Sequence, residues 1–89
     1  SLRKDFAFLI NSNISAETLI KEIKKVDSKI GEITVFDVYK NKDKSELSLA
    51  IEVEIIQRNK VLTTQEIGLL MDDIIKTVEK KVGAKLRTR

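Results

Sequence analysis

Apolar and polar residues alternate most regularly over residues 47–57. Four aliphatic residues fall on one face, namely Leu49, Ile51, Val53 and Ile55. Small or charged residues fall on the other face, namely Ser48, Ala50, Glu52 and Glu54. Because successive side chains of a strand point to opposite faces, this segment predicts a strand with one packed face and one open face.

Three further segments have features of strands. Residues 5–10 carry an apolar residue at every second position, and residues 32–40 are rich in β-branched and aromatic residues. Residues 84–87 are long enough for a short final strand. The polar residues 41–46 lie between the second and third strands and predict a loop.

Two segments carry apolar residues at helical spacing. Ser15 is expected to cap the first helix, because its hydroxyl can accept from free amides of the first turn, and Gly31 is expected to mark its exit. Thr63 and Glu66 match a capping box at the start of the second helix. Gly83 stands where a left-handed C-cap belongs. The apolar positions are Leu19, Ile20, Ile23 and Val26, and then Ile67, Leu70, Met71, Ile74, Ile75, Val78 and Val82.

The predicted order is therefore βαββαβ. Each helix can join parallel strands through a right-handed crossover. The expected fold is a ferredoxin-like α+β domain, a four-stranded antiparallel sheet with both helices on one face and the other face open. The 89 residues have room for one domain, so we expect residues 1–89 to form a single unit.

Composition narrows the possible chemistry. Cysteine and histidine are absent, which excludes thiolate catalysis, cysteine metal sites and the usual general base at neutral pH. No calcium-loop spacing or glycine-rich phosphate loop occurs, so we expect no catalytic residues, metal or cofactor in this chain. No apolar run is long enough to cross a membrane, and there is no signal-peptide pattern. The formal net charge of +3 is compatible with a polyanionic partner.

The open face of the predicted sheet carries a candidate binding patch. If Phe36 and Val38 face the helices, their neighbours Asp37 and Tyr39 face outward. A hairpin that pairs Tyr39 with Ser48 also pairs Asp37 with Ala50. The four outward residues Asp37, Tyr39, Ser48 and Ala50 then form one patch.

This patch has the chemistry to hold an unstacked nucleobase. It combines an aromatic ring for stacking, a carboxylate and a hydroxyl for reading a base edge, and a small floor that Ala7 would extend. Lys40, Lys42 and Lys44 lie beside it and could meet phosphates.

The same residues also have explanations without RNA. The ring of Tyr39 would cover an edge strand, the carboxylate of Asp37 would satisfy a turn amide, and the lysines would be a solvated loop. Two other functions stay open: a regulatory domain of this topology that binds small molecules, and a protein-docking module. The general RNA-recognition module is disfavoured, because its aromatic-rich signature is missing from the third strand.

Several segments resemble one known family. They are residues 3–8 (RKDFAF), 35–39 (VFDVY), 48–51 (SLAI), 62–66 (LTTQE) and 83–87 (GAKLR). Together they are similar to the ferredoxin-fold anticodon-binding domain at the end of bacterial phenylalanyl-tRNA synthetase β chains. The loop of residues 41–47 departs from the family pattern, since it lacks Gly and Pro and has Leu47 where a basic residue is common.

The resemblance implies roles for the patch residues. Tyr39 would stack on the first anticodon base, a guanine, and Asp37 and Ser48 would hydrogen-bond to it. It also implies a cytoplasmic parent enzyme, an α2β2 assembly with an α subunit that uses ATP and Mg²⁺ to join phenylalanine to tRNA-Phe. This chain would be the excised recognition end, without aminoacylation activity of its own.

Overall fold

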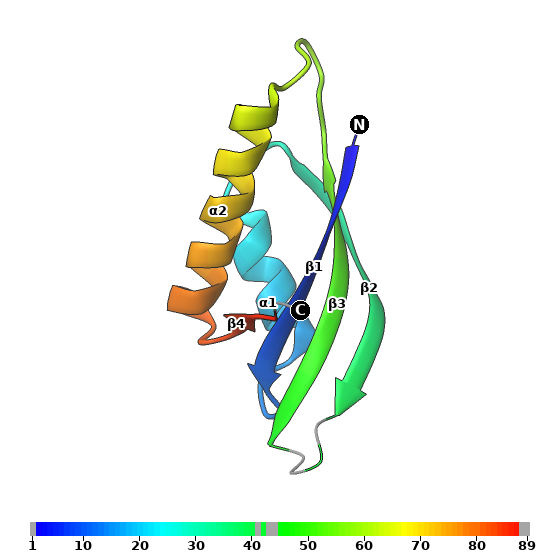
Figure 1. The fold of residues 1–89 in the computed structure, drawn as a ribbon, viewed down its shortest axis with the longest axis vertical. Coiled ribbons are helices and arrows are strands. Elements are labelled where there is room, and N and C mark those ends of the chain that lie inside the picture. The colour runs from blue at the N-terminus through cyan, green and yellow to red at the C-terminus, as the bar shows by residue number, and fades with distance from the viewer. Residues whose placement is uncertain (1, 41, 43–44, 88–89) are drawn as a thin grey trace.

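The fold is described from a computed structural model, which describes residues 2–40, 42 and 45–87. Its elements in chain order are β1 (Leu2–Asn11), α1 (Ala16–Lys24), β2 (Ile30–Lys40), β3 (Glu46–Ile55), α2 (Thr64–Lys81) and β4 (Lys85–Leu86). Both helices lie on one side of the sheet, and the other side is left open (Figure 1).

The strands form one sheet in the order β2-β3-β1-β4, and all the pairings are antiparallel. This arrangement confirms the predicted ferredoxin-like α+β fold. β1 and β3 are the central strands, so each is paired on both sides. β2 and β4 are the two edges, and β4 is only two residues long.

Capping starts and ends the helices largely as expected. The side chain of Ser15 accepts from the amide of Thr18, and Thr63 and Glu66 form both bonds of a capping box. Gly83 has a φ of +73°, the left-handed conformation that glycine adopts without steric cost.

Gly31 does not mark the exit of the first helix. α1 ends at Lys24, and Gly31 lies in β2. The chain turns earlier, where the backbone amide of Lys29 donates to Asp27 Oδ1 at 2.8 Å. A Cβ on Gly31 would lie 2.5 Å from Glu54 Oε1, so a larger residue at this position of β2 would require the end of the Glu54 side chain to move.

The core lies between the sheet and the two helices. Its buried side chains are Phe6, Phe8, Ile10, Leu19, Ile23, Ile30, Leu49, Ile51, Val53, Ile55, Leu70, Ile74, Val78, Val82 and Ala84. The four aliphatic residues predicted on one face of the third strand are all among them, which confirms the assignment of its two faces.

Phe36 does not face the helices, contrary to our expectation, whereas Val38 lies on their side of the sheet but is not covered by them. β2 contains a β-bulge between Val35 and Asp37, so Phe36 is an extra residue with no partner of its own on β3. Phe36 is 57% exposed. Val38 lies opposite Leu49 but is 53% exposed. The bulge puts Asp37 opposite Ala50, on the open face, while Val35 keeps its place opposite Ile51.

Candidate functional site

The predicted patch is present on the open face of the sheet. Tyr39 pairs with Ser48 and Asp37 pairs with Ala50, as the strand pattern indicated. Ala7 of β1 lies on the other side of Ala50 and extends the small floor. The patch borders an open hollow of about 440 Å³. Its lining residues are Asp5, Phe6, Ala7, Phe36, Asp37, Tyr39, Ser48, Ala50 and Arg87.

Tyr39 and Asp37 present accessible groups to this hollow. Tyr39 is 60% exposed, so a flat ring is available for stacking. Asp37 is exposed and has no hydrogen-bond or ion-pair partner in the described part of the chain. Both carboxylate oxygens of Asp37 can therefore accept from a ligand.

Ser48 has a different setting from its two neighbours. It is only 5% exposed, and its Oγ accepts a hydrogen bond of 2.9 Å from Arg87 Nη1. A hydroxyl has two lone pairs and one proton, so this bond leaves the Ser48 proton free to donate. Ser48 can thus still donate its proton toward the hollow, and one lone pair of Oγ also stays available.

Arg87 is a member of the site that the sequence pattern did not single out. Its amide donates to the carbonyl of Ala7 at 2.7 Å, which fixes the chain just after β4 against β1. Arg87 and Ser48 are 39 positions apart in the sequence. The only available signal was the resemblance over residues 83–87, which gave Arg87 no role.

The positions of the three predicted phosphate-binding lysines are less well defined than those of the patch residues. Lys40 is exposed at the end of β2, and Lys42 is exposed in the turn that follows. Lys44 lies outside the described residues. Of the three lysines, only Lys40 is therefore placed directly beside the patch, at the end of β2.

Two carboxylates elsewhere on the open face, those of Glu52 and Glu54, make internal contacts. Arg3 Nη1 donates to Glu52 Oε1 at 3.1 Å, and Glu54 Oε1 accepts from the amide of Glu32 at 3.1 Å. These carboxylates are held by their neighbours, so they do not compete with Asp37 as ligand-binding groups.

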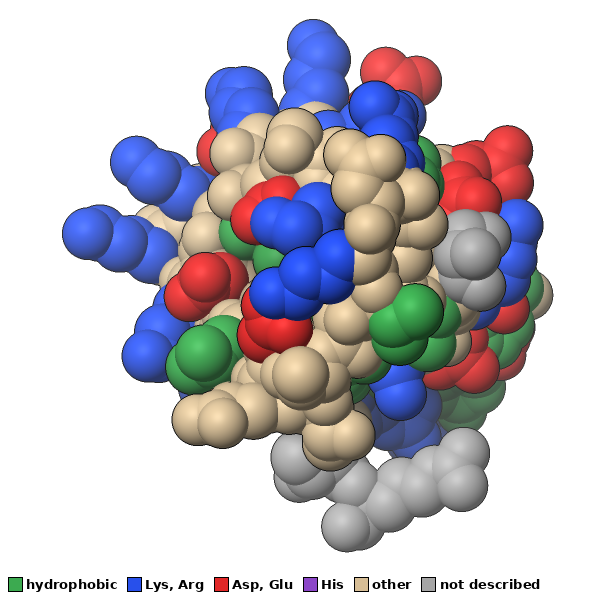
Figure 2. Space-filling view, turned by 90° about the horizontal axis from the view of Figure 1, so that it is seen from above, with side chains coloured by type: hydrophobic (Ala, Val, Ile, Leu, Met, Phe, Trp, Pro, Cys, Tyr) green, Lys and Arg blue, Asp and Glu red, His purple; other side chains and the backbone are tan. Residues whose placement is uncertain are grey.

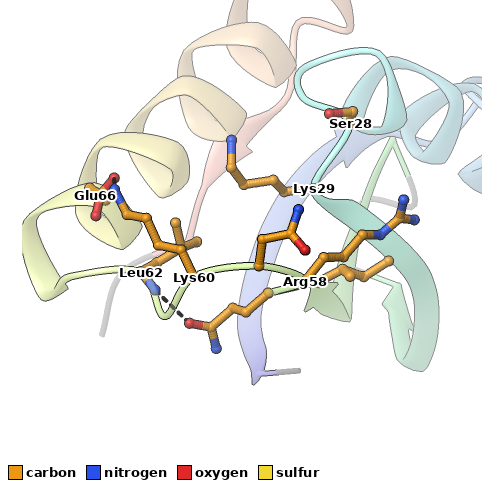
Figure 3. Close-up of a pocket in the computed structure, with 9 residues that line it drawn as sticks. Ser28, Lys29, Arg58, Lys60, Leu62 and Glu66 are labelled. Atoms are coloured by element: carbon orange, nitrogen blue, oxygen red, sulfur yellow. Dashed lines mark hydrogen bonds and ion pairs between the residues drawn. The ribbon is translucent and has the colours of Figure 1, made fainter.

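A second hollow lies at the end of the molecule where β3 leads into α2 (Figure 3). Lys29, Arg58 and Lys60 line it, but Figure 3 shows their charged ends pointing apart. Lys60 Nζ lies 3.1 Å from Glu66 Oε2, so its charge is already paired. Figure 2, which views this end, shows basic side chains with acidic ones between them. These cations do not converge on one ligand.

Two further observations concern the described residues only. Within them, no three acidic side chains gather closely enough to hold a metal ion. Neither of the two helices described here has the length and apolar character needed to cross a membrane.

Comparison with known proteins identifies the family. The family model described as the ferredoxin-fold anticodon binding domain matches residues 1–87. The chain belongs to this family. Its curated relatives include the phenylalanine–tRNA ligase beta subunits of Bradyrhizobium diazoefficiens, 39% identical over 94% of this chain, and of Carboxydothermus hydrogenoformans, 34% identical over 98%. The matched region is 11% of each relative's length.

The open side of a ferredoxin-fold anticodon binding domain here carries an aromatic ring, a carboxylate, a buried hydroxyl and a guanidinium around one hollow. This set of groups can stack on a flat ring and can offer both acceptors and donors to its edge.

Proposed function

We propose that this chain binds the anticodon of tRNA-Phe through the open face of its sheet. The observation that supports this most directly is the pairing of Tyr39 and Asp37 with Ser48 and Ala50 around one hollow, in a chain of the anticodon-binding family. Tyr39 would stack on the first anticodon base. Asp37 and Ser48 would hydrogen-bond to its edge, above the floor made by Ala50.

The chemistry of Asp37 favours guanine as that base. The Watson–Crick edge of guanine presents two adjacent donors, N1–H and the N2 amino group. A carboxylate accepts on both oxygens and can take the two bonds side by side. Adenine has an acceptor at N1, which would face the negative oxygens, so discrimination would come largely from rejecting adenine.

The second part of the proposal concerns the longer protein to which this chain would belong. We propose that residues 1–89 are one anticodon-binding unit of a cytoplasmic phenylalanine–tRNA ligase β subunit, which assembles with an α subunit as α2β2. ATP and Mg²⁺ would serve the aminoacylation reaction elsewhere in that enzyme. The role of this unit is recognition, and Lys40 and Lys42, with Lys44, would meet tRNA phosphates.

The test compares Asp37→Ala with the unchanged chain on two anticodon stem-loops, one with guanine and one with adenine at the first anticodon position. At one fixed salt concentration, the substitution should reduce the preference for guanine by about 1–3 kcal/mol. Asp73→Ala is a matched control, because Asp73 is an exposed carboxylate on α2, away from the open face.

Equal losses for both stem-loops would mean that Asp37 positions the protein but does not read the base. Absence of binding by the unchanged chain to either stem-loop would reject the proposal and favour a regulatory or protein-docking role for this face.

A further inference from the structure

The side chain of Arg87 spans the open face of the sheet from its β4 edge. The backbone of Arg87 is bonded to Ala7 on β1, whereas its guanidinium reaches Ser48 on β3. Since β1 lies between β4 and β3, the side chain must pass over β1. The small side chain of Ala7 leaves room for this path on the face where the hollow lies.

The guanidinium keeps unused donors in this position. Arg87 has five N–H donors and no acceptor, and one of its nitrogens, Nη1, is bonded to Ser48 Oγ. It has no ion-pair partner within 4.0 Å among residues 2–40, 42 and 45–87. The hollow therefore contains a donor group from Arg87 as well as the acceptor group of Asp37.

We propose that Arg87 is a specificity-determining residue that donates to the O6 carbonyl of a guanine in this hollow. The inference rests on the proposed function and deepens it. Asp37, on β2, would accept from N1–H and the N2 amino group, while Arg87, on the other side of the floor, would donate to O6. The carboxylate of Asp37 and the guanidinium of Arg87 would then contact all three polar groups of guanine's Watson–Crick edge: the two donors and the O6 acceptor.

This arrangement separates guanine from the other bases. Adenine presents an amino group at the six position and cytosine presents one at the four position, and either would face the donors of Arg87. Uracil offers a carbonyl to Arg87 and N3–H to Asp37, but it has an O2 acceptor where guanine has an amino group. Only guanine satisfies Arg87 and both oxygens of Asp37 together.

The test uses stem-loops that differ by one group at the first anticodon position. They contain guanine, 6-thioguanine, which replaces O6 by a weakly accepting sulfur, or inosine, which lacks only the N2 amino group. The proteins are the unchanged chain, Arg87→Met and Arg87→Lys. Lys85→Met is the matched control, because it removes a cation from β4 itself.

The unchanged chain should bind the 6-thioguanine loop about 10-fold more weakly than the guanine loop, the usual cost of weakening a bond to a charged group. In Arg87→Met this ratio should fall clearly below that of the unchanged chain, because the neutral hydroxyl of Ser48 is then the remaining donor to O6. The loss caused by inosine, which reports on Asp37, should remain. Lys85→Met should keep both ratios and lower all affinities together.

Two results would overturn the inference. One is a 6-thioguanine penalty that persists undiminished in Arg87→Met. The other is an equal loss of affinity for all three loops in Arg87→Met, as expected for a phosphate contact.

If Arg87→Met does not give a cooperative thermal transition, Arg87→Lys provides the test. Its 6-thioguanine ratio should fall below that of the unchanged chain, and an unchanged ratio would reject the role. Failure of the unchanged chain to prefer guanine over adenine would instead reject the proposed function.

Discussion

Tyr39 and Leu69 are equally exposed to solvent, at 60% each. Tyr39 lies on the open face of the sheet, whereas Leu69 lies on α2. Tyr39→Ala should therefore weaken binding of the anticodon stem-loop by about 1–3 kcal/mol, the usual cost of losing one base–aromatic stack. The thermal transition should hardly move, because the ring is not part of the core. Binding can be measured by fluorescence anisotropy and folding by circular dichroism.

Leu69→Ala is the matched control for that experiment. It removes a side chain of equal exposure from the helix layer and should leave stem-loop binding unchanged. If Tyr39→Ala unfolds the domain, or if both substitutions weaken binding equally, the ring of Tyr39 is not a stacking platform.

Strand parity predicted the pairings of the patch, but it could not find every member. Tyr39 and Asp37 were placed correctly because the alternation in β3 is regular and fixes which face is open. Phe36 was misplaced because a β-bulge breaks the period of two, and the bulge has no marker such as glycine. Arg87 was missed because a two-residue strand has no periodicity to read, and its contact with Ser48 depends on tertiary pairing.

The start of α2 contains a pH-dependent contact. Glu66 Oε1 accepts from the amide of Thr63 at 3.0 Å, and Lys60 lies at 3.1 Å from Glu66 Oε2. The backbone hydrogen bond from Thr63, with the bond to Lys60, lowers the pKa of Glu66 below its ordinary value. A carboxyl whose folded pKa is lowered stabilises the protein above its unfolded pKa, and this contribution is lost as the pH falls through the folded pKa.

Glu66→Gln should reveal this dependence. The amide side chain keeps an acceptor but does not titrate, so the melting temperature of the unchanged chain should exceed that of the variant near neutral pH. The difference should shrink as the pH falls from about 5 to about 3. Thermal melts at several pH values measure it, and a difference that stays constant over this range would contradict the assignment.

Element boundaries were predicted well where capping residues mark them and poorly elsewhere. The start of α1 at Ser15 and the start of α2 at Thr63 have side chains that bond to the first-turn amides. The end of α1 has no such marker, and Gly31 was taken for it. The turn is made instead by Asp27, whose side chain accepts from the amide of Lys29, a local bond that acidic residues often form in turns.

At the scale of the whole molecule, the net charge of +3 should make RNA binding weaken with added salt. Lys40→Ala should lower the slope of log affinity against log salt by about one unit or less, because it removes one cation beside the patch. The preference for guanine over adenine should not change. Lys76→Ala, on α2, is the control and should leave the slope unaltered.

An affinity that does not depend on salt would contradict this expectation and would favour a neutral docking surface. A slope reduced equally by Lys40→Ala and Lys76→Ala would mean that only the total charge matters, with no contact at the patch.

Because β4 is only two residues long, binding of a base should affect how easily this edge strand separates from the sheet. β2 and β4 are its two edges, and the groups of Asp37 and Arg87 come from these opposite edges. A nucleobase held by both would link the outermost strands across the two central ones. In the free chain the two-residue β4 should fray readily, so its amides should exchange with deuterated water quickly. In the complex, detachment of β4 would require release of the base, and the same amides should become slow-exchanging.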